Sequence, residues 1–209
     1  MSFIKEYKNV IPPLLCSFII DKLEEEQLMG EGRLGDGRVD HNIKKCFDYK
    51  ISDEIVQNSE FWKETNTFLM DLFAKYMQKY LLEYVGPEIF QLKSIEQTKQ
   101  RLNSVFHGDL KISGMQIQKY IPGCYFKPHV DDIPLGPRRM VAGILYLNDV
   151  DVKDGGSTRF YNGREIQPEI GKIVLFPSTW TYLHQGTELK NGLKYIITTF
   201  AINPKTEDV

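Results

Sequence analysis

Hydrophobic positions follow a helical period in the first half of the chain and a strand period in the second half. The first periodic run covers residues 14–29, where Leu15, Ile19 and Leu23 recur at intervals of four and share one face. Pro13 lies before the run, and proline is favoured in the first turn of a helix. These features predict an amphipathic helix over residues 14–29.

A second, longer run covers residues 60–85, in which aromatic and aliphatic residues from Phe61 to Leu81 keep the helical period. Gly86 and Pro87 follow it directly. Glycine tolerates a left-handed cap and proline cannot continue a helix, so we expect this helix to end there.

Residues 30–46 separate the two runs and are rich in glycine. Gly30, Gly32 and Gly35 match the letters of the dinucleotide-binding fingerprint GxGxxG. That fingerprint needs a strand before it and a helix after it, whereas here a helix comes first and no helical period follows. We therefore interpret the segment as a mobile loop.

From about residue 112 the chain consists of short alternating or β-branched runs separated by glycine, proline and aspartate. The predicted strands lie within residues 114–120, 140–148, 159–161, 165–171, 172–176, 179–186 and 193–202. Many short strands at close spacing predict an antiparallel sandwich or barrel, of which the jelly roll is one form. Because no linker or repeat interrupts the pattern, we expect a single domain, residues 1–209, in which helices support a β core.

Composition and charge narrow the class of protein. Apolar residues make up 42% of the chain, which is enough for a packed core. A net charge of −2 provides no basic field, so we expect no nucleic-acid partner. The sequence has neither a signal-peptide pattern nor an apolar run as long as a membrane span, so we expect a cytoplasmic protein that does not enter a membrane. The three cysteines are widely spaced, which argues against a disulfide framework or a thiolate zinc site.

One histidine and one aspartate have the spacing of metal ligands. On a strand, His129 and Asp131 would project from the same face with their α-carbons roughly 6.6 Å apart. Such a pair by itself is more often a surface hydrogen-bond couple, so a third ligand is needed. His41 and His107 lie in polar, loop-like segments. His184 ends an apolar strand just before a glycine turn, and a barrel can bring that strand end to residue 129, so it is the best-placed third ligand.

Two imidazoles and one carboxylate form a facial triad, which is typical of non-haem Fe(II) oxygenases. Zinc hydrolysis uses the same ligand types and is the competing chemistry. Lys194 bears on the choice, because it shares one face of the last predicted strand with Ile196, Thr198 and Phe200. If that face is buried, the ammonium group needs an anion, and an organic acid at the metal would supply one. The alternatives are that this face is the exterior, or that an internal Asp or Glu pairs with the lysine.

Residues 113–203 resemble the catalytic domain of Fe(II)/2-oxoglutarate-dependent dioxygenases, particularly the prolyl 4-hydroxylase group. The segments that carry the resemblance run in family order: YIPGCYFKPHVD, RRMVAGILYLND, DGGSTRF, IQPEIGKIVLFPS and HQGTELKNGLKYIITTF. The first hundred residues match only loosely. The resemblance implies a mainly β fold with α support, a double-stranded β-helix (jelly roll, cupin-like) packed against an N-terminal helical layer and substrate-side loop within residues 1–105.

The resemblance also implies roles for individual residues. Iron would be held by His129, Asp131 and His184. Five residues would bind 2-oxoglutarate. Lys194 would pair with its far carboxylate, and the others are Tyr120, Thr158, Tyr146 and Thr198. Arg139 matches an arginine that faces the substrate, with a surface charge beside Arg138 as the alternative. Residues 30–38 and 131–139 are expected either to form a lid or to be plain solvated loops.

The activity implied is hydroxylation of a substrate C–H bond with O2, release of succinate and CO2, and use of ascorbate. A prolyl 4-hydroxylase of the procollagen-proline 4-dioxygenase type, acting on peptide or protein proline, is the leading expectation. The alternatives are the same chemistry on a free amino acid or small metabolite, a non-catalytic metal- or ligand-binding jelly-roll module, and a zinc hydrolase. The sequence does not predict the oligomeric state.

Overall fold

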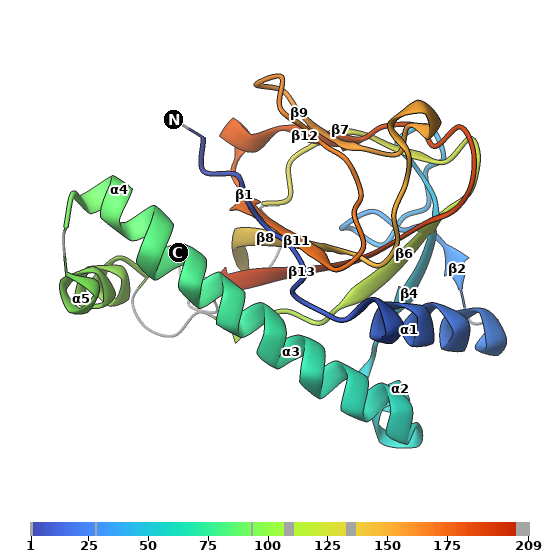
Figure 1. Cartoon of the computed structure of the whole chain (residues 1–209), viewed down its shortest axis with the longest axis horizontal. Coiled ribbons are helices and arrows are strands. Elements are labelled where there is room, and N and C mark those ends of the chain that lie inside the picture. Colours follow the sequence, from blue (N-terminus) through green and yellow to red (C-terminus); the bar gives the residue numbers. More distant parts are fainter. Residues whose placement is uncertain (1, 28, 93, 107–110, 133–136, 204–209) are drawn as a thin grey trace.

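Two antiparallel sheets face each other, and helices cover the outer face of the larger one (Figure 1). The structure is a computed structural model that describes residues 2–27, 29–92, 94–106, 111–132 and 137–203. Within these residues the larger sheet has eight strands in the order β1-β11-β8-β13-β6-β4-β2, with β5 paired to β13. The smaller sheet has five strands in the order β10-β9-β12-β7-β3. This two-sheet arrangement confirms the predicted jelly roll with α support.

The strands of the larger sheet are β1 (Lys5–Tyr7), β2 (Gly30–Glu31), β4 (Phe47–Lys50), β5 (Lys111–Ile112), β6 (Gln116–Tyr120), β8 (Arg138–Tyr146), β11 (Lys172–Pro177) and β13 (Lys194–Asn203). Those of the smaller sheet are β3 (Lys44–Lys45), β7 (Tyr125–His129), β9 (Thr158–Phe160), β10 (Glu165–Ile166) and β12 (His184–Gly186). Every strand segment predicted after residue 112 contains an observed strand. The segment predicted as 179–186 begins with a 3-10 turn, Trp180–Tyr182, before β12.

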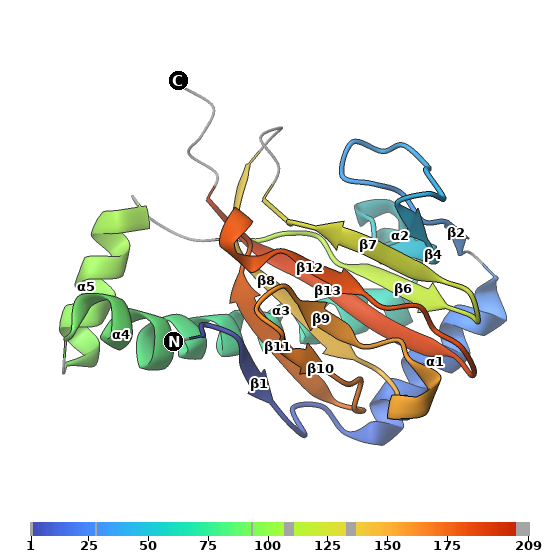
Figure 2. The ribbon, with the colours of Figure 1, turned by 90° about the horizontal axis from the view of Figure 1, so that it is seen from above.

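The helices are α1 (Pro13–Glu26), α2 (Asp53–Asn58), α3 (Glu60–Tyr80), α4 (Gly86–Phe90) and α5 (Ile95–Phe106), with a π turn at Leu81–Val85. The first predicted helix is therefore confirmed as α1, with Ile19 and Leu23 fully buried. Figure 2 shows α3 passing across the larger sheet on the side opposite the smaller one. In the described part of the chain, no helix is long and apolar enough to cross a membrane.

The core has two compartments, one between the helices and the larger sheet and one between the two sheets. Gly143 of β8 lets α3 approach the sheet closely. A β-carbon at this position would lie 2.9 Å from Met77 Cε and 3.0 Å from Phe73 Cε1, which is closer than packed side chains tolerate. The space between the two sheets is left for a pocket.

The predicted end of the second helix at Gly86 and Pro87 is wrong. Gly86 has a right-handed φ of −61°, and the chain continues into α4 with Pro87 in its first turn. A β-carbon at Gly86 would lie 2.1 Å from Thr98 Cγ2 of α5. The glycine therefore allows α5 to pack closely, and the left-handed residue comes later, at Gln91 (φ 54°).

Residues 30–46 are not wholly loop, because β2 pairs with β4 and β3 pairs with β7. The segment thus spans from the larger sheet to the smaller one. Two expectations fall partly or wholly outside the described residues: the environment of His107, and residues 133–136 of the predicted lid or loop at 131–139.

Candidate functional site

Antiparallel pairing of β7 and β12 brings two distant histidines together. His129 is the last residue of β7, His184 is the first of β12, and the two are direct partners in the ladder. Residues opposite each other in an antiparallel pair project from the same face. Asp131 lies in a bend beyond β7, so the expectation that it shares a strand with His129 is wrong. The bend nevertheless turns its carboxylate toward both rings.

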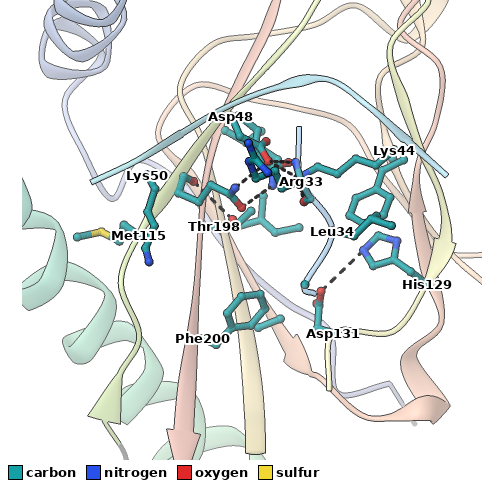
Figure 3. Close-up of a pocket in the computed structure, with 18 of the residues that line it drawn as sticks. Arg33, Leu34, Lys44, Asp48, Lys50, Met115, His129, Asp131, Thr198 and Phe200 are labelled. Carbon is teal, nitrogen blue, oxygen red and sulfur yellow. Dashed lines mark hydrogen bonds and ion pairs between the residues drawn. The ribbon is translucent and has the colours of Figure 1, made fainter. Parts of the chain in front are cut away.

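The three side chains form a compact donor set. His129 Nε2 lies 3.7 Å from Asp131 Oδ1, and His184 Nε2 lies 3.6 Å from Asp131 Oδ2. The candidate ligand atoms of the three residues all lie within 4.8 Å of one another. Two imidazole nitrogens and one carboxylate oxygen at this spacing suit a divalent transition metal with open coordination positions. Figure 3 shows His129 and Asp131 facing each other across the pocket.

Backbone carbonyls orient both imidazoles. His129 Nδ1 lies 2.8 Å from Lys127 O, and His184 Nδ1 lies 3.0 Å from Tyr182 O. A proton held at Nδ1 by a carbonyl leaves Nε2 free as a ligand. The Phe126 ring stacks on His129 at 3.5 Å. Burial lowers the pKa of His129 to about 4, with a further contribution from His184, so this imidazole is neutral at pH 7.

A pocket of about 870 Å³ lies between the sheets and contains the triad. The larger sheet forms one wall of this pocket. Its pocket-facing residues form three ranks across β13, β6 and β4: Lys194 and Tyr120; Ile196, Gln118 and Asp48; Thr198, Gln116 and Lys50. Phe200 and Arg139 lie beyond the third rank.

Lys194 occupies the buried end of the pocket. Its side chain is 1% exposed, so the face it shares with Ile196 is not the exterior. The Nζ donates a hydrogen bond to Gly156 O at 2.7 Å and lies 4.4 Å from the centre of the Tyr120 ring. No carboxylate pairs with this ammonium among the described residues, which excludes an internal Asp or Glu within that part of the chain. Burial lowers the pKa of Lys194 to about 8.

The other predicted cosubstrate residues lie near this end at different depths. Tyr120 donates its hydroxyl proton to Gln118 Oε1 at 2.8 Å, and Thr158 lines the pocket. Tyr146 is fully buried behind Thr158, and their hydroxyl oxygens are 2.7 Å apart. Tyr146 therefore supports the wall and does not line it. Thr198 lines the pocket one rank further out.

Arg139 and Arg138 have different environments. The Arg139 guanidinium lies 4.0 Å from the centre of the Phe200 ring and donates to Asp131 O at 3.2 Å. Arg138 is exposed and forms an ion pair with Asp132. Arg139 is thus half-buried beside the triad, and the surface-charge alternative does not describe it.

A buried ion pair in the pocket wall escaped the sequence-based prediction. Lys44 Nζ lies 2.7 Å from Asp48 Oδ2 and also donates to Arg33 O at 3.0 Å. The same carboxylate oxygen accepts from Arg33 N at 2.8 Å and from Gln116 Nε2 at 2.7 Å (Figure 3). The sequence offers one weak indication, an aspartate between two aromatic residues of a short strand.

Comparison with known proteins agrees with this geometry. Residues 115–202 match the family model described as the 2OG-Fe(II) oxygenase superfamily. No curated protein matches the sequence.

Solved structures of prolyl hydroxylases share the fold. A viral collagen prolyl hydroxylase from Paramecium Bursaria Chlorella virus-1, in a 2OG complex, has a TM-score of 0.62 at 17% identity, covering 97% of each chain. A Pseudomonas putida prolyl-4-hydroxylase has a TM-score of 0.64 at 16% identity, covering 98% of this chain and 94% of that one. A Trichoplax adhaerens prolyl hydroxylase, in complex with a hypoxia inducible factor peptide fragment, has a TM-score of 0.65 at 16% identity, covering 98% and 86%.

Proposed function

We propose that this protein is a 2OG-Fe(II) dioxygenase of the prolyl 4-hydroxylase-like type that hydroxylates proline in a peptide or protein. The support is the match of residues 115–202 to the 2OG-Fe(II) oxygenase superfamily model and the fold shared with solved prolyl hydroxylases. The observation that carries the proposal is the relation between two features of one pocket. A His129–Asp131–His184 donor set lies in the same cavity as Lys194, a buried cation for which the described residues provide no carboxylate.

The metal half of the proposal rests on the donor set. His129, Asp131 and His184 fit Fe(II), because they offer two imidazole nitrogens and one carboxylate oxygen and leave coordination positions open. Bound Fe(II) supplies the redox chemistry by which O2 and 2-oxoglutarate yield succinate, CO2 and a hydroxylated substrate. The carbonyl bonds to Nδ1 of both rings keep the ligand nitrogens aimed at the metal position.

The cosubstrate half rests on Lys194. 2-Oxoglutarate is a diacid, so one end can reach the triad while the far carboxylate forms an ion pair with the buried ammonium. The Tyr120 and Thr158 hydroxyls lie at that end. Thr158 would donate to the same carboxylate while accepting from Tyr146, and Tyr120 would do so by exchanging its hydrogen bond to Gln118 Oε1 for one to the carboxylate. Tyr146 would act by holding Thr158 in place. Thr198 lies one rank beyond Ile196, on the path between the two ends.

The substrate half of the proposal rests on the shape of the site. The pocket extends past the triad to Arg139 and the glycine-rich segment, which leaves room for a peptide. The Trichoplax adhaerens relative carries a peptide fragment, which favours a peptide over a free metabolite as the class of substrate here. Ascorbate, as the reductant that would keep iron ferrous, is part of the proposal.

The test is a turnover screen of the Fe(II)-loaded protein with 2-oxoglutarate. Proline-containing peptides, free amino acids and a substrate-free blank are compared by succinate formation and by mass spectrometry for the gain of one oxygen. We expect oxygen on proline of a peptide. Oxygen on free amino acids alone would establish the small-molecule alternative. Iron and cosubstrate binding without succinate from any of them would favour a non-catalytic module.

A further inference from the structure

The open end of the pocket has an excess of positive charge. Arg33, Lys50 and Arg139 line the pocket, and none of the three side chains forms an ion pair within the described residues. Of the acidic residues that line the same pocket, Asp48 is paired with Lys44, Asp36 is paired with Arg38, and Asp131 faces the two histidines. Glu31 has the His41 imidazole at 3.2 Å, which offsets its charge only when that ring is protonated. Cations without partners at the mouth of an enzyme pocket attract anionic groups of a ligand.

Arg139 is the cation nearest the triad. Its guanidinium carbon lies 4.0 Å from the centre of the Phe200 ring, and Nη1 donates to Asp131 O at 3.2 Å. The remaining guanidinium donors have no partner among the described residues. A planar guanidinium held in this way is suited to a two-point contact with a carboxylate.

Lys50 lies on the neighbouring part of the larger sheet. It is the last residue of β4 and stands in the rank of Gln116 and Thr198. Figure 3 shows Lys50 on the side of the pocket where Met115 and Phe200 lie. Its ammonium is exposed and unpaired within the described chain, so it is available to a ligand at the mouth.

Arg33 is fixed through its backbone. Its N–H donates to Asp48 Oδ2 at 2.8 Å, and its carbonyl accepts from Lys44 Nζ at 3.0 Å. Lys44 is 2% exposed and Asp48 is 9% exposed, so this ion pair is shielded from water and salt. A buried, fully hydrogen-bonded ion pair favours one arrangement of its neighbours. The pair therefore holds the backbone at the start of the glycine-rich segment against the pocket wall, and the exposed Arg33 side chain donates through Nη1 to Gly37 O at 2.9 Å.

From these three cations we propose that the substrate is anionic beside the carbon that is modified: a peptide with acidic residues flanking its target proline. The inference rests on the proposed function and deepens it by naming the substrate class. Carboxylates of the peptide form charge-assisted hydrogen bonds with Arg33, Lys50 and Arg139. Basic flanks are rejected by like-charge repulsion.

The test measures binding separately from turnover. Fluorescently labelled proline peptides that differ only in having Glu, Gln or Lys flanks are titrated with the Fe(II)- and 2-oxoglutarate-loaded protein under nitrogen. We expect the Glu peptide to bind about tenfold more tightly than the Gln peptide at low salt, with the Lys peptide weakest and the differences shrinking at high salt. Arg33→Gln and Lys50→Gln should each reduce the Glu-over-Gln preference about threefold or more. Lys153→Gln, which removes the same charge from an exposed residue outside the pocket, should leave the preference unchanged.

Equal binding of the Glu and Gln peptides overturns the inference, as does an equal loss of preference in the Lys153→Gln control. The inference is also overturned if free proline or free glutamate displaces the labelled Glu peptide at the same concentration as the unlabelled peptide does. The site would then recognise a small carboxylate and not a peptide. The proposed function is judged independently by mass spectrometry of the peptides in air. If all three peptides gain oxygen equally, the proposed hydroxylation stands and the preference for acidic flanks is rejected. If binding is charge-selective but no peptide gains oxygen, the preference for acidic flanks stands and the proposed hydroxylation is rejected.

Discussion

Lys194 and Tyr120 are direct ladder partners of β13 and β6, and the ammonium of the first lies 4.4 Å from the centre of the second's ring. The ammonium and the phenol ring close the inner end of the pocket. Among the described residues, no carboxylate pairs with the ammonium there. An ammonium that is 1% exposed and paired only with neutral groups is costly to bury. A bound diacid would offset that cost.

Replacing this lysine should weaken the cosubstrate and spare the metal. In Lys194→Met we expect the 2-oxoglutarate concentration for half-maximal succinate formation to rise about 30-fold or more, because losing one partner of a buried charge pair costs upward of about 2 kcal/mol. Iron binding should stay unchanged. Lys63→Met, at an exposed lysine of α3, is the matched control. An unaltered requirement in Lys194→Met would mean that the cosubstrate's far carboxylate lies elsewhere.

The same lysine should give the cosubstrate-free protein a characteristic pH dependence. Its pKa is lowered to about 8 by burial, whereas the unfolded chain keeps the ordinary value near 10.5. Between these values Lys194 binds more protons in the unfolded state than in the folded one, so its own contribution to the free energy of unfolding rises with pH. Burial raises the pKa values of the neighbouring Cys46 thiol and Tyr120 hydroxyl, and these groups contribute in the opposite direction, so the effect of the lysine is isolated by comparing Lys194→Met with the parent protein.

Urea unfolding of the cosubstrate-free protein measures this effect. Below pH 8 we expect Lys194→Met to be more stable than the parent protein, by at most about 3 kcal/mol at about 1.4 kcal/mol per pKa unit. The difference should shrink as the pH rises toward 10.5. A difference that is constant with pH would show that the lysine is not titrating in the folded protein.

Metal binding should stabilise the protein only when the triad is intact. Fe(II) added under nitrogen should raise the melting temperature, since a ligand that binds only the folded state shifts the unfolding equilibrium. Asp131→Ala and His184→Ala should abolish the shift and reduce succinate formation to background. Asp151→Ala alters an exposed carboxylate paired with Lys153 outside the pocket and should keep both. An undiminished shift in either triad variant contradicts the assignment of the ligands.

The buried ion pair of Lys44 and Asp48 should be sensitive to the loss of one partner alone. Lys44→Met leaves the Asp48 carboxylate buried and should destabilise the fold by about 3–5 kcal/mol. In Lys44→Met/Asp48→Leu most of this loss should be recovered, because no charge remains to be buried. Urea unfolding tests both variants. A double variant no more stable than Lys44→Met would mean that the contacts of Asp48 with Arg33 and Gln116 matter more than the ion pair.

Gly86 should tolerate alanine only when its neighbour is trimmed. Gly86→Ala brings a β-carbon to 2.1 Å from Thr98 Cγ2 and should cost about 1–3 kcal/mol of stability through overpacking. In a Thr98→Ser background, which removes that methyl group, the cost should fall by half or more. Gly114→Ala is the control, since a β-carbon there meets nothing within 4 Å. An equal cost in both backgrounds would point to the contact with Leu81 O as the cause.

Periodicity and local spacing predicted much of the fold from the sequence. The face of α1 and the strands after residue 112 follow from periods of 3.6 and 2 that burial imposes on each element separately. The predicted approach of His129 to His184 also agrees with the structure, in which the two residues are ladder partners of β7 and β12.

What the sequence did not predict depends on tertiary contacts. The sequence paired Asp131 with His129 on the assumption that residues two apart on a strand share a face. The two side chains do meet, but Asp131 reaches His129 from a bend beyond the strand. The role of Gly86 depends on α5, and the burial of the Lys44–Asp48 pair depends on the placement of β4 beside β6, from which Gln116 also reaches Asp48. The depth of Tyr146 behind Thr158 likewise depends on how β8 of the larger sheet faces β9 of the smaller one, which sequence alone does not fix.

The ladder pairing of His129 with His184 also determines when the site can exist during folding. The two rings come from strands that the chain visits far apart, with β8, β9, β10 and β11 between them. Closing so long a stretch of chain is slow and costs entropy, so the two imidazoles meet only after most of both sheets have assembled. We therefore expect a nascent or truncated chain that lacks β12 not to bind metal at this position. The time at which metal affinity appears during refolding would then report when the two sheets have assembled.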